Sequence, residues 1–307
     1  MLDKPSLQTL LEVQKHFALP SPVLVEKDWY VVAALAAINS ADLKPFRLVF
    51  SGGTALSRGH RVIQRMSEDI DLKIVSDKPP SRPELRELRD AVTNALLKAG
   101  FEFDPQNKAH RGSANATRYT VYRLPYAPQV QGEGALRPEI KIETSVWPLR
   151  LPPVERSVIS FRAEAHKHQP EVPSIPCVAI TETAAEKFVA LTRRVGAELA
   201  DARIPHDKDL VRHIYDLHAI KMHHQDADIL ALVRNIIPDD VKAYGHQFPA
   251  YRENPVAETL RAITGLATDG RFADDYGTFL RDMVYGEAVE FKTALATVSS
   301  LADGLRT

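Results

Sequence analysis

The segment from Leu48 to Val75, LVFSGGTALSRGHRVIQRMSEDIDLKIV, brings an apolar strand, a glycine pair, a basic stretch and two spaced acidic residues into one short piece of chain. An apolar run that stops abruptly at glycines predicts a strand followed by a tight turn. Gly52 and Gly53 stand where this strand passes into a helix, and without a β-carbon they let backbone N–H groups approach a phosphate. A tight turn that binds no ligand is the alternative interpretation of the glycine pair.

The same segment contains the acidic motif SEDIDL. The period of a strand puts Ser67, Asp69 and Asp71 on one face, provided that the strand already begins at Ser67. Two carboxylates at this spacing repel each other unless a cation lies between them. Mg²⁺ takes oxygen ligands and keeps substrate phosphates in its coordination shell, so the pair predicts a magnesium site, with Mn²⁺ as the alternative ion. A solvated strand face is the competing interpretation.

A third carboxylate is expected if two metal ions are to hold the attacking and the leaving oxygens through shared ligands. The segment EIKIETSV alternates apolar and charged residues, which leaves Glu139 and Glu143 on the face opposite the apolar side chains. We select Glu143 as the third acid and as a metal ligand, and the periodicity leaves Glu139 as the alternative.

Composition limits the partners and the compartment. A formal net charge of −1 gives no general attraction to nucleic acid, so an RNA partner has to meet a local basic patch. The single cysteine, Cys177, excludes an internal disulfide framework and a multi-thiolate zinc site. The N-terminus lacks a signal pattern, and the longest apolar run, Val31 to Ile38, is too short to span a membrane. We therefore expect a cytoplasmic protein without a membrane segment.

The hydrophobic pattern changes along the chain. Its first half mixes helical and strand periods, and the residues after Thr181 are nearly all of the helical type. Between them, the proline-rich stretch from Pro148 to Pro176 is typical of a connection between domains. The sequence predicts an α+β chain with two domains. Residues 1–165 form a mixed sheet flanked by helices, and residues 166–307 form a helical C-terminal domain.

Two charged residues stand out in the helical half. Lys187 lies one turn from Ala184 and from Leu191, beside the apolar stripe of an amphipathic helix, where an ammonium attracts an anion. A lysine that extends its head group to water is the alternative. Asp216 follows Arg212 by one turn, and this spacing favours an intrahelical ion pair worth about 0.3–0.5 kcal/mol if exposed.

Five motifs occur in a specific order: VEKDWYVVAAL, FSGGTALSRGHRVIQRMSEDIDL, IKIE, TAAEKFVAL and RHIYDL. This ordered set resembles the AbiEii/AbiGii nucleotidyltransferase toxins, relatives of the MenT toxins, and it extends over most of the chain. The resemblance implies a DNA polymerase β-like nucleotidyltransferase core followed by a helical domain that contributes Lys187 and Asp216 to the cleft. The chain departs from the family pattern in two places: His213 follows Arg212 where relatives often have Asp, and the third acid is Glu143 where many nucleotidyltransferases use Asp.

The resemblance implies roles for individual residues. Asp69, Asp71 and Glu143 would hold Mg²⁺, Lys187 would stabilise the substrate phosphates, and Asp216 would organise the substrate, which makes these five the catalytic set. The implied nucleotide-binding residues are Ser51, Gly52, Gly53, Ser67 and Lys187.

The implied reaction is transfer of a nucleoside monophosphate from an NTP to an RNA hydroxyl, with release of pyrophosphate. Family members modify the 3′ end of tRNA and so block translation, and a cognate antitoxin protein neutralises them. Basic residues on both sides of the acid pair are candidates for RNA contacts, although charge runs are often solvated surface. The candidates are Arg58, Arg61, Arg65, Arg193, Arg194 and Arg212. The alternative functions are a metal-dependent glycosyltransferase that uses a nucleotide sugar and a catalytically silent binding module.

Ser67 is also a candidate site for regulatory modification by phosphorylation or nucleotidylation. A phosphate there would bring up to about two negative charges next to Asp69 and Asp71 and would oppose triphosphate binding. A serine that only closes the turn before the strand is the alternative.

Overall fold

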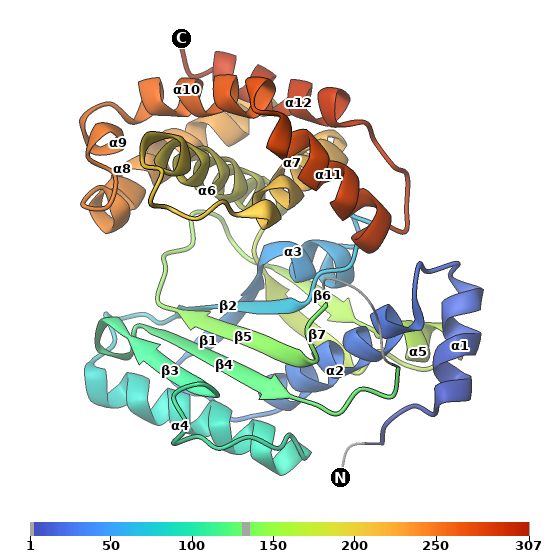
Figure 1. Cartoon of the computed structure of the whole chain (residues 1–307). Coiled ribbons are helices and arrows are strands. Elements are labelled where there is room, and N and C mark those ends of the chain that lie inside the picture. The colour runs from blue at the N-terminus through green and yellow to red at the C-terminus, as the bar shows by residue number, and fades with distance from the viewer. Residues whose placement is uncertain (1–2, 131–135, 307) are drawn as a thin grey trace. The chain divides into compact units, whose positions relative to one another are not determined.

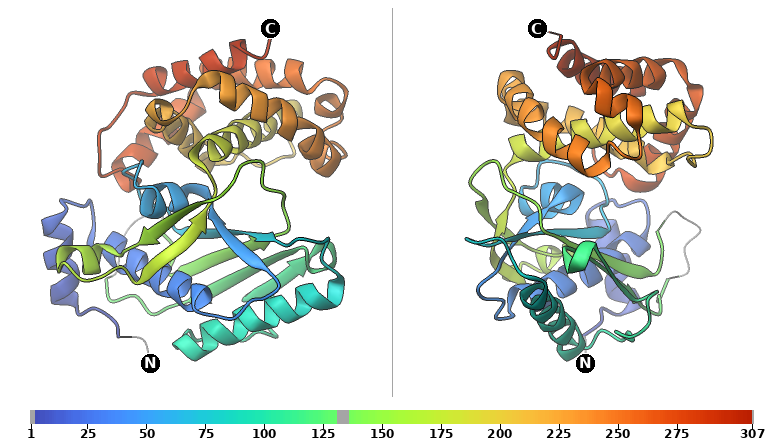
Figure 2. Two further views of the ribbon diagram at one scale, coloured as in Figure 1. Left: turned by 180° about the vertical axis from the view of Figure 1, so that it is seen from behind. Right: turned by 90° about the vertical axis from the view of Figure 1, so that its left-hand side faces the viewer.

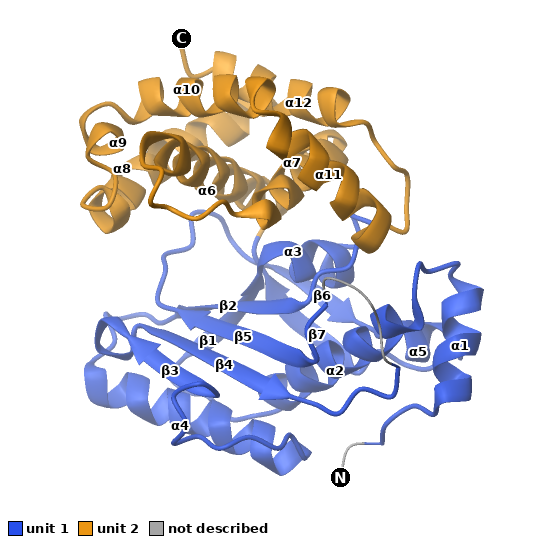
Figure 3. Cartoon of the chain, viewed as in Figure 1, with its two compact units in different colours: residues 1–178 blue, residues 179–307 orange. Residues whose placement is uncertain are grey.

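The computed structural model describes residues 3–130 and 136–306. The chain divides into two compact units, Met1–Val178 and Ala179–Thr307 (Figure 3). The first unit extends beyond the predicted boundary at residue 165 because the last strand of its sheet, β7 (Val172–Cys177), lies in the stretch that the prolines led us to interpret as a connection. The sequence PYAPQVQGEGALRP over residues 125–138 also predicts a loop, which falls partly outside the described residues.

The first unit is built on one seven-stranded sheet (Figure 1). Its strands, in order across the sheet, are β3 (Arg111–Ala114), β4 (Tyr119–Pro125), β5 (Glu139–Ser145), β2 (Asp69–Val75), β1 (Arg47–Ser51), β7 and β6 (Val154–Val158). The pairs β2–β5 and β1–β7 are parallel, and the remaining pairs are antiparallel. A mixed sheet followed by helices confirms the predicted α+β class.

Helices α2 (Pro22–Asn39) and α4 (Arg82–Ala99) cover one face of this sheet (Figures 1 and 2). Apolar residues of β2 and β5 pack with both helices in one buried cluster. Helix α4 begins with a capping box between Ser81 and Glu84 and ends at Gly100 in the left-handed conformation, so its bounds follow directly from the sequence. The other helices of the unit are α1 (Leu7–His16), α3 (Gly52–Thr54) and α5 (Phe161–Ala165).

The second unit consists of helices in its described residues. They are α6 (Ile180–Ala200), α7 (Val211–Ala219), α8 (Asp226–Tyr244), α9 (Pro249–Glu253), α10 (Pro255–Thr268), α11 (Gly270–Met283) and α12 (Phe291–Asp303). Helix α6 packs against α7, α8 and α10 and buries residues along most of its length. In the part of the chain that the structure describes, no helix is both long and apolar enough to cross a bilayer.

Candidate active site

The register of the central strands brings the predicted acids together. Asp71 pairs with Ser51 of β1 on one side and with Glu143 of β5 on the other. Asp69 pairs with Lys141 in the same way. Because paired residues of neighbouring strands project to the same side of a sheet, all of these side chains lie on the face opposite the apolar cluster.

The register also favours Glu143 over Glu139 as the third acid. Strand β5 begins to pair with β2 at Lys141, so Glu139 precedes the paired segment. Glu139 lies opposite Pro125 of β4, and its backbone carbonyl accepts a hydrogen bond from the Lys27 ammonium. Of the two glutamates, Glu143 is the one that stands beside Asp71.

Two neighbours keep Glu143 ionised. Burial acts to raise the pKa of its carboxyl, but the Tyr119 hydroxyl that donates to it and the Lys141 ammonium together hold the pKa below its ordinary value. The pKa of Tyr119 is raised by burial and by this contact, so the phenol stays a donor. A carboxylate with a lowered pKa is better suited to bind a cation than to act as a base that accepts a proton.

Lys141 places its ammonium among these acids. Its Nζ lies 3.1 Å from a Glu143 oxygen and 3.8 Å from an Asp69 oxygen. Burial lowers the pKa of Lys141, but Asp69 and Glu143 outweigh it and the pKa is raised. Within residues 3–130 and 136–306, no three acidic, histidine or cysteine side chains are arranged to hold a metal ion. Carboxylates from two adjacent strands nevertheless suit Mg²⁺ in their chemistry, and Lys141 is the cation that offsets part of their charge.

The glycine pair lets the turn after β1 lie against the acids. Gly52 has φ +75°, and a β-carbon there would collide with the Asp71 carboxylate. A β-carbon on Gly53 would come within 2.5 Å of Arg65 Nη2 and 2.7 Å of Ser67 Oγ. The helix that follows is short: α3 passes at once into a π-helical turn over Ala55–Gly59, a distortion found frequently at functional sites.

Ser51 and Ser67 are both placed beside this turn. The Ser51 hydroxyl donates to the Asp71 carbonyl at 3.1 Å. Strand β2 begins at Asp69, so Ser67 precedes the strand. The sequence placed Ser67 on the same strand face as Asp69 and Asp71 only if the strand began at Ser67, and this condition is not met. Its hydroxyl instead forms a 3.0 Å hydrogen bond with Thr54, which also donates to the Asp69 carbonyl. Ser51, Gly52, Gly53, Ser67 and the acid pair therefore form one cluster.

Three charged residues, Glu26, Lys27 and Asp28, lie inside α2 and are all buried, so they do more than the capping and dipole interactions expected of charges that precede an apolar helix. The Lys27 ammonium lies 3.0 Å from a Glu68 carboxylate oxygen and donates to the carbonyls of Arg137 and Glu139. It therefore ties the residue before Asp69 to the start of β5. The available signal was three consecutive charges in an otherwise apolar helix.

Two arginines predicted to contact RNA are internal. Arg58 is 8% exposed, forms a 2.6 Å ion pair with Asp28, and stacks 3.5 Å from the centre of the Phe161 ring. Arg65 is 3% exposed and donates to the Met66 carbonyl at 2.8 Å. Both side chains hold the first unit together, so their assignment to an RNA surface does not fit. Arg61, between them in sequence, is exposed.

Within the second unit, Lys187 of α6 and Asp216 of α7 pair with each other. Their charged atoms are 2.8 Å apart, with side-chain exposures of 8% and 0%. Arg212 pairs with Asp209 at 2.8 Å. The roles assigned to Lys187 and Asp216 toward a nucleotide stay predictions.

The comparisons with known proteins agree with these motifs. The solved structure of MenT4, a nucleotidyltransferase toxin from Mycobacterium tuberculosis H37Rv, is similar to this chain with a TM-score of 0.51 and 16% sequence identity, over 97% of this chain and 89% of that one. At this identity the likeness concerns the fold, and it confirms the predicted nucleotidyltransferase architecture. No curated protein sequence matches. The model of the nucleotidyl transferase AbiEii toxin of type IV toxin–antitoxin systems matches residues 33–297, and the chain therefore belongs to this family.

Proposed function

We propose that this nucleotidyltransferase toxin transfers a nucleoside monophosphate from an NTP to an RNA hydroxyl, with the 3′ end of tRNA as the acceptor, and thereby blocks translation. The observation that carries the proposal is the pairing of Asp71 with Glu143 beside the Gly52 turn. Membership in a toxin–antitoxin family supports a cognate antitoxin as the partner that neutralises it. A cytoplasmic location follows from a tRNA acceptor.

In this proposal Asp69, Asp71 and Glu143 hold Mg²⁺. Bound Mg²⁺ would neutralise charge on the triphosphate and polarise the attacking hydroxyl. The Gly52–Gly53 turn lies directly against the Asp71 carboxylate, so phosphates bound by the turn would lie next to the acids. Tyr119 keeps the Glu143 carboxylate oriented by donating to it. The reaction then depends on positioning and electrostatic stabilisation, as phosphoryl transfer does in general. The roles assigned to Lys187 and Asp216 stay predictions.

The decisive test uses purified protein, Mg²⁺, total tRNA and each of the four labelled NTPs separately. We expect label at the tRNA 3′ end, and a loss of about 10²–10³-fold in the rate with Asp71→Asn, because one charge-stabilising group is commonly worth that much. Asp77→Asn is the matched control, since Asp77 is an exposed acid just beyond the same strand. Equal rates for the two variants would reject the proposed site. Label that enters only the protein would reject RNA as the acceptor.

Lys141→Met is expected to tighten Mn²⁺ binding by roughly tenfold, because an ammonium next to a bound divalent ion opposes it by on the order of 1–2 kcal/mol. The Lys141 head group is 31% exposed, which limits the effect through solvent screening. Isothermal titration with Mn²⁺ measures the affinity without any turnover. Lys141→Arg keeps the charge and should bind Mn²⁺ as the wild type does. Weaker binding in Lys141→Met would mean that Lys141 supports the ion rather than competing with it.

We also propose Ser67 as the place where modification stops the reaction. Its Oγ lies next to Gly53 and near the acids, so an added phosphate would repel an incoming triphosphate. Intact-mass and peptide analysis of toxin co-expressed with its antitoxin should detect the added mass on Ser67. Fully unmodified but inactive toxin would speak against this route.

A further inference from the structure

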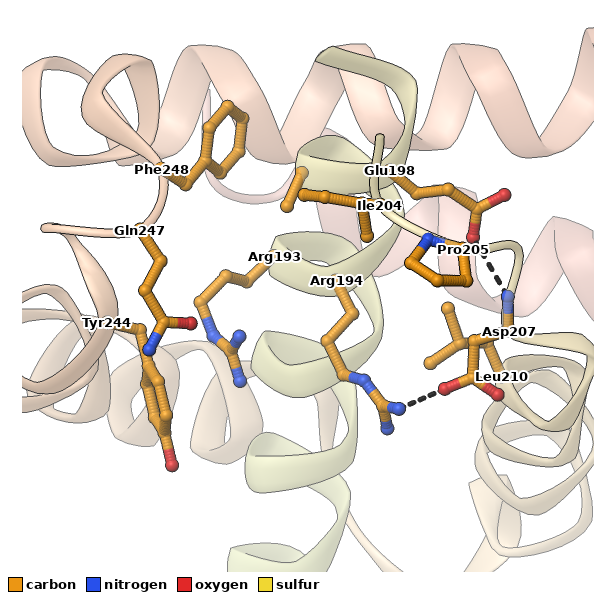
Figure 4. Close-up of a pocket in the computed structure, with 11 residues that line it drawn as sticks. Arg193, Arg194, Glu198, Ile204, Pro205, Asp207, Leu210, Tyr244, Gln247 and Phe248 are labelled. Carbon is orange, nitrogen blue, oxygen red and sulfur yellow. Dashed lines mark hydrogen bonds and ion pairs between the residues drawn. The ribbon is translucent and has the colours of Figure 1, made fainter. Parts of the chain in front are cut away.

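The helical unit contains a pocket of about 300 Å³ that lies apart from the acid cluster in the chain (Figure 4). It is formed by the C-terminal half of α6, the loop that follows it, and the end of α8. The residues that characterise it are Arg193, Arg194, Ile204, Pro205, Tyr244 and Gln247. Its volume is at the small end of the range for ligand pockets and suits a single small unit.

Arg193 pairs with a buried carboxylate beside this pocket. Its Nε lies 2.9 Å from the Asp240 carboxylate, and its guanidinium lies 4.0 Å from the centre of the Tyr244 ring. Only 14% of the Arg193 side chain is exposed. An arginine fixed by a buried carboxylate and covered by an aromatic ring is a pre-organised planar cation, on which another flat group can stack.

Arg194 differs from Arg193 because its charge can be released. Its side chain is 45% exposed and pairs with Asp207, which is 31% exposed. Figure 4 shows this pair at the other side of the pocket from Tyr244. Surface ion pairs contribute little, about 0–1 kcal/mol, so an anionic group can replace Asp207 at small cost.

Apart from Glu198, the rest of the lining is apolar or neutral. Ile204 is 37% exposed, and Pro205 stands next to it. Gln247 is exposed and offers both a donor and an acceptor. A planar cation, an apolar wall, an exposed amide and a releasable arginine together match two parts of a nucleotide: a base, which can stack and form hydrogen bonds at its edge, and a phosphate.

We propose that this pocket binds one unpaired nucleotide of the RNA acceptor, an assignment that rests on the proposed function. The charge of the lining favours a phosphodiester over an NTP. Glu198 and Asp207 line the pocket together with the two arginines, so the net charge is close to zero. Such a site accommodates the single charge of a phosphodiester and opposes the several charges of a triphosphate. A base in a duplex cannot stack on Arg193, so the pocket selects single-stranded RNA.

The test measures binding of a short fluorescent single-stranded RNA by anisotropy in the Asp71→Asn background, so that no transfer occurs. We expect Arg194→Ala and Gln247→Ala each to weaken binding by roughly tenfold, the lower part of the range for one stacked and bonded base. Arg261→Ala is the control, because the Arg261 side chain is 52% exposed, and neither Arg261 nor its partner Glu258 lines the pocket. It should change the affinity less than about twofold.

The outcomes separate this inference from the proposed function. Equal losses for Arg194→Ala and Arg261→Ala, equal binding of duplex and single-stranded RNA, or binding of NTP but not RNA at the pocket would each overturn it. If Arg194→Ala and Gln247→Ala transfer the label to RNA at the normal rate, the role of the pocket would be rejected and the proposed transferase activity would be kept. If the protein transfers no label but its RNA binding still depends on the pocket residues, the role of the pocket would be kept and the proposed transferase activity would be rejected. Crosslinking of 4-thiouridine RNA to Gln247 or Tyr244, mapped by mass spectrometry, locates the contact directly.

Discussion

Asp216→Asn is expected to lower the free energy of unfolding of the helical unit by about 3–5 kcal/mol, the usual cost of leaving a buried charge without its partner. Asp216 is fully buried and its carboxylate lies 2.8 Å from the Lys187 ammonium, which is itself only 8% exposed. The variant leaves that ammonium opposite a neutral amide. Hydrogen exchange of α6 and α7 measures the loss in the helices that the pair joins.

A double variant separates stability from catalysis at this pair. Replacing both partners of a buried ion pair with apolar residues of similar volume is often neutral or stabilising. Lys187→Met combined with Asp216→Leu should therefore restore protection in α6 and α7. Loss of nucleotidyl transfer in this folded double variant would then report a role in the reaction. A wild-type level of protection in Asp216→Asn alone would contradict the structural prediction.

Lys27→Met is expected to destabilise the first unit by a similar amount, about 3–5 kcal/mol. The Lys27 side chain is 1% exposed, and its loss takes the ammonium away from the Glu68 carboxylate and removes a donor to two backbone carbonyls. Both tryptophans, Trp29 and Trp147, lie in this unit, so their fluorescence in urea follows its unfolding.

The control for Lys27 is an exposed pair in the same unit. Arg47 and Glu155 lie 2.7 Å apart, and both side chains are more than half exposed. Arg47→Ala should cost only about 0–1 kcal/mol, because water screens such a pair. If Lys27→Met lowered the free energy of unfolding no more than Arg47→Ala does, the prediction that the Lys27 contacts stabilise the first unit would be wrong. Activity should fall as well: in a variant that still folds, a Glu68 without Lys27 should displace the neighbouring Asp69.

The acid cluster was predictable because it depends on local alternation. A strand period and an abrupt glycine stop were sufficient to put Asp69 and Asp71 on one face next to the turn. The choice between Glu139 and Glu143 was not predictable from local alternation. It depends on which residue of β5 lies opposite Asp71, and this is decided by the register between two strands that are distant in sequence.

Two predictions were wrong because they also depend on contacts between residues that are distant in sequence. Pro173 and Pro176 led us to interpret the residues of β7 as a connection, although β7 makes only one paired position with β1 and so tolerates prolines better than a central strand would. Arg58 and Arg65 were interpreted as surface cations because no periodicity reveals a buried partner. Asp28 is distant from Arg58 in sequence, and the fold is what makes them neighbours.

The parallel ladder between β2 and β5 has a further consequence for how this protein tolerates change. A slip of one residue in β5 would turn the Glu143 side chain toward the helices and present Ile142 to Asp71 instead. The same slip would remove Ile140 and Ile142 from the apolar cluster. Insertions or deletions that shift this strand would therefore abolish folding and chemistry at once, whereas point changes can affect one without the other.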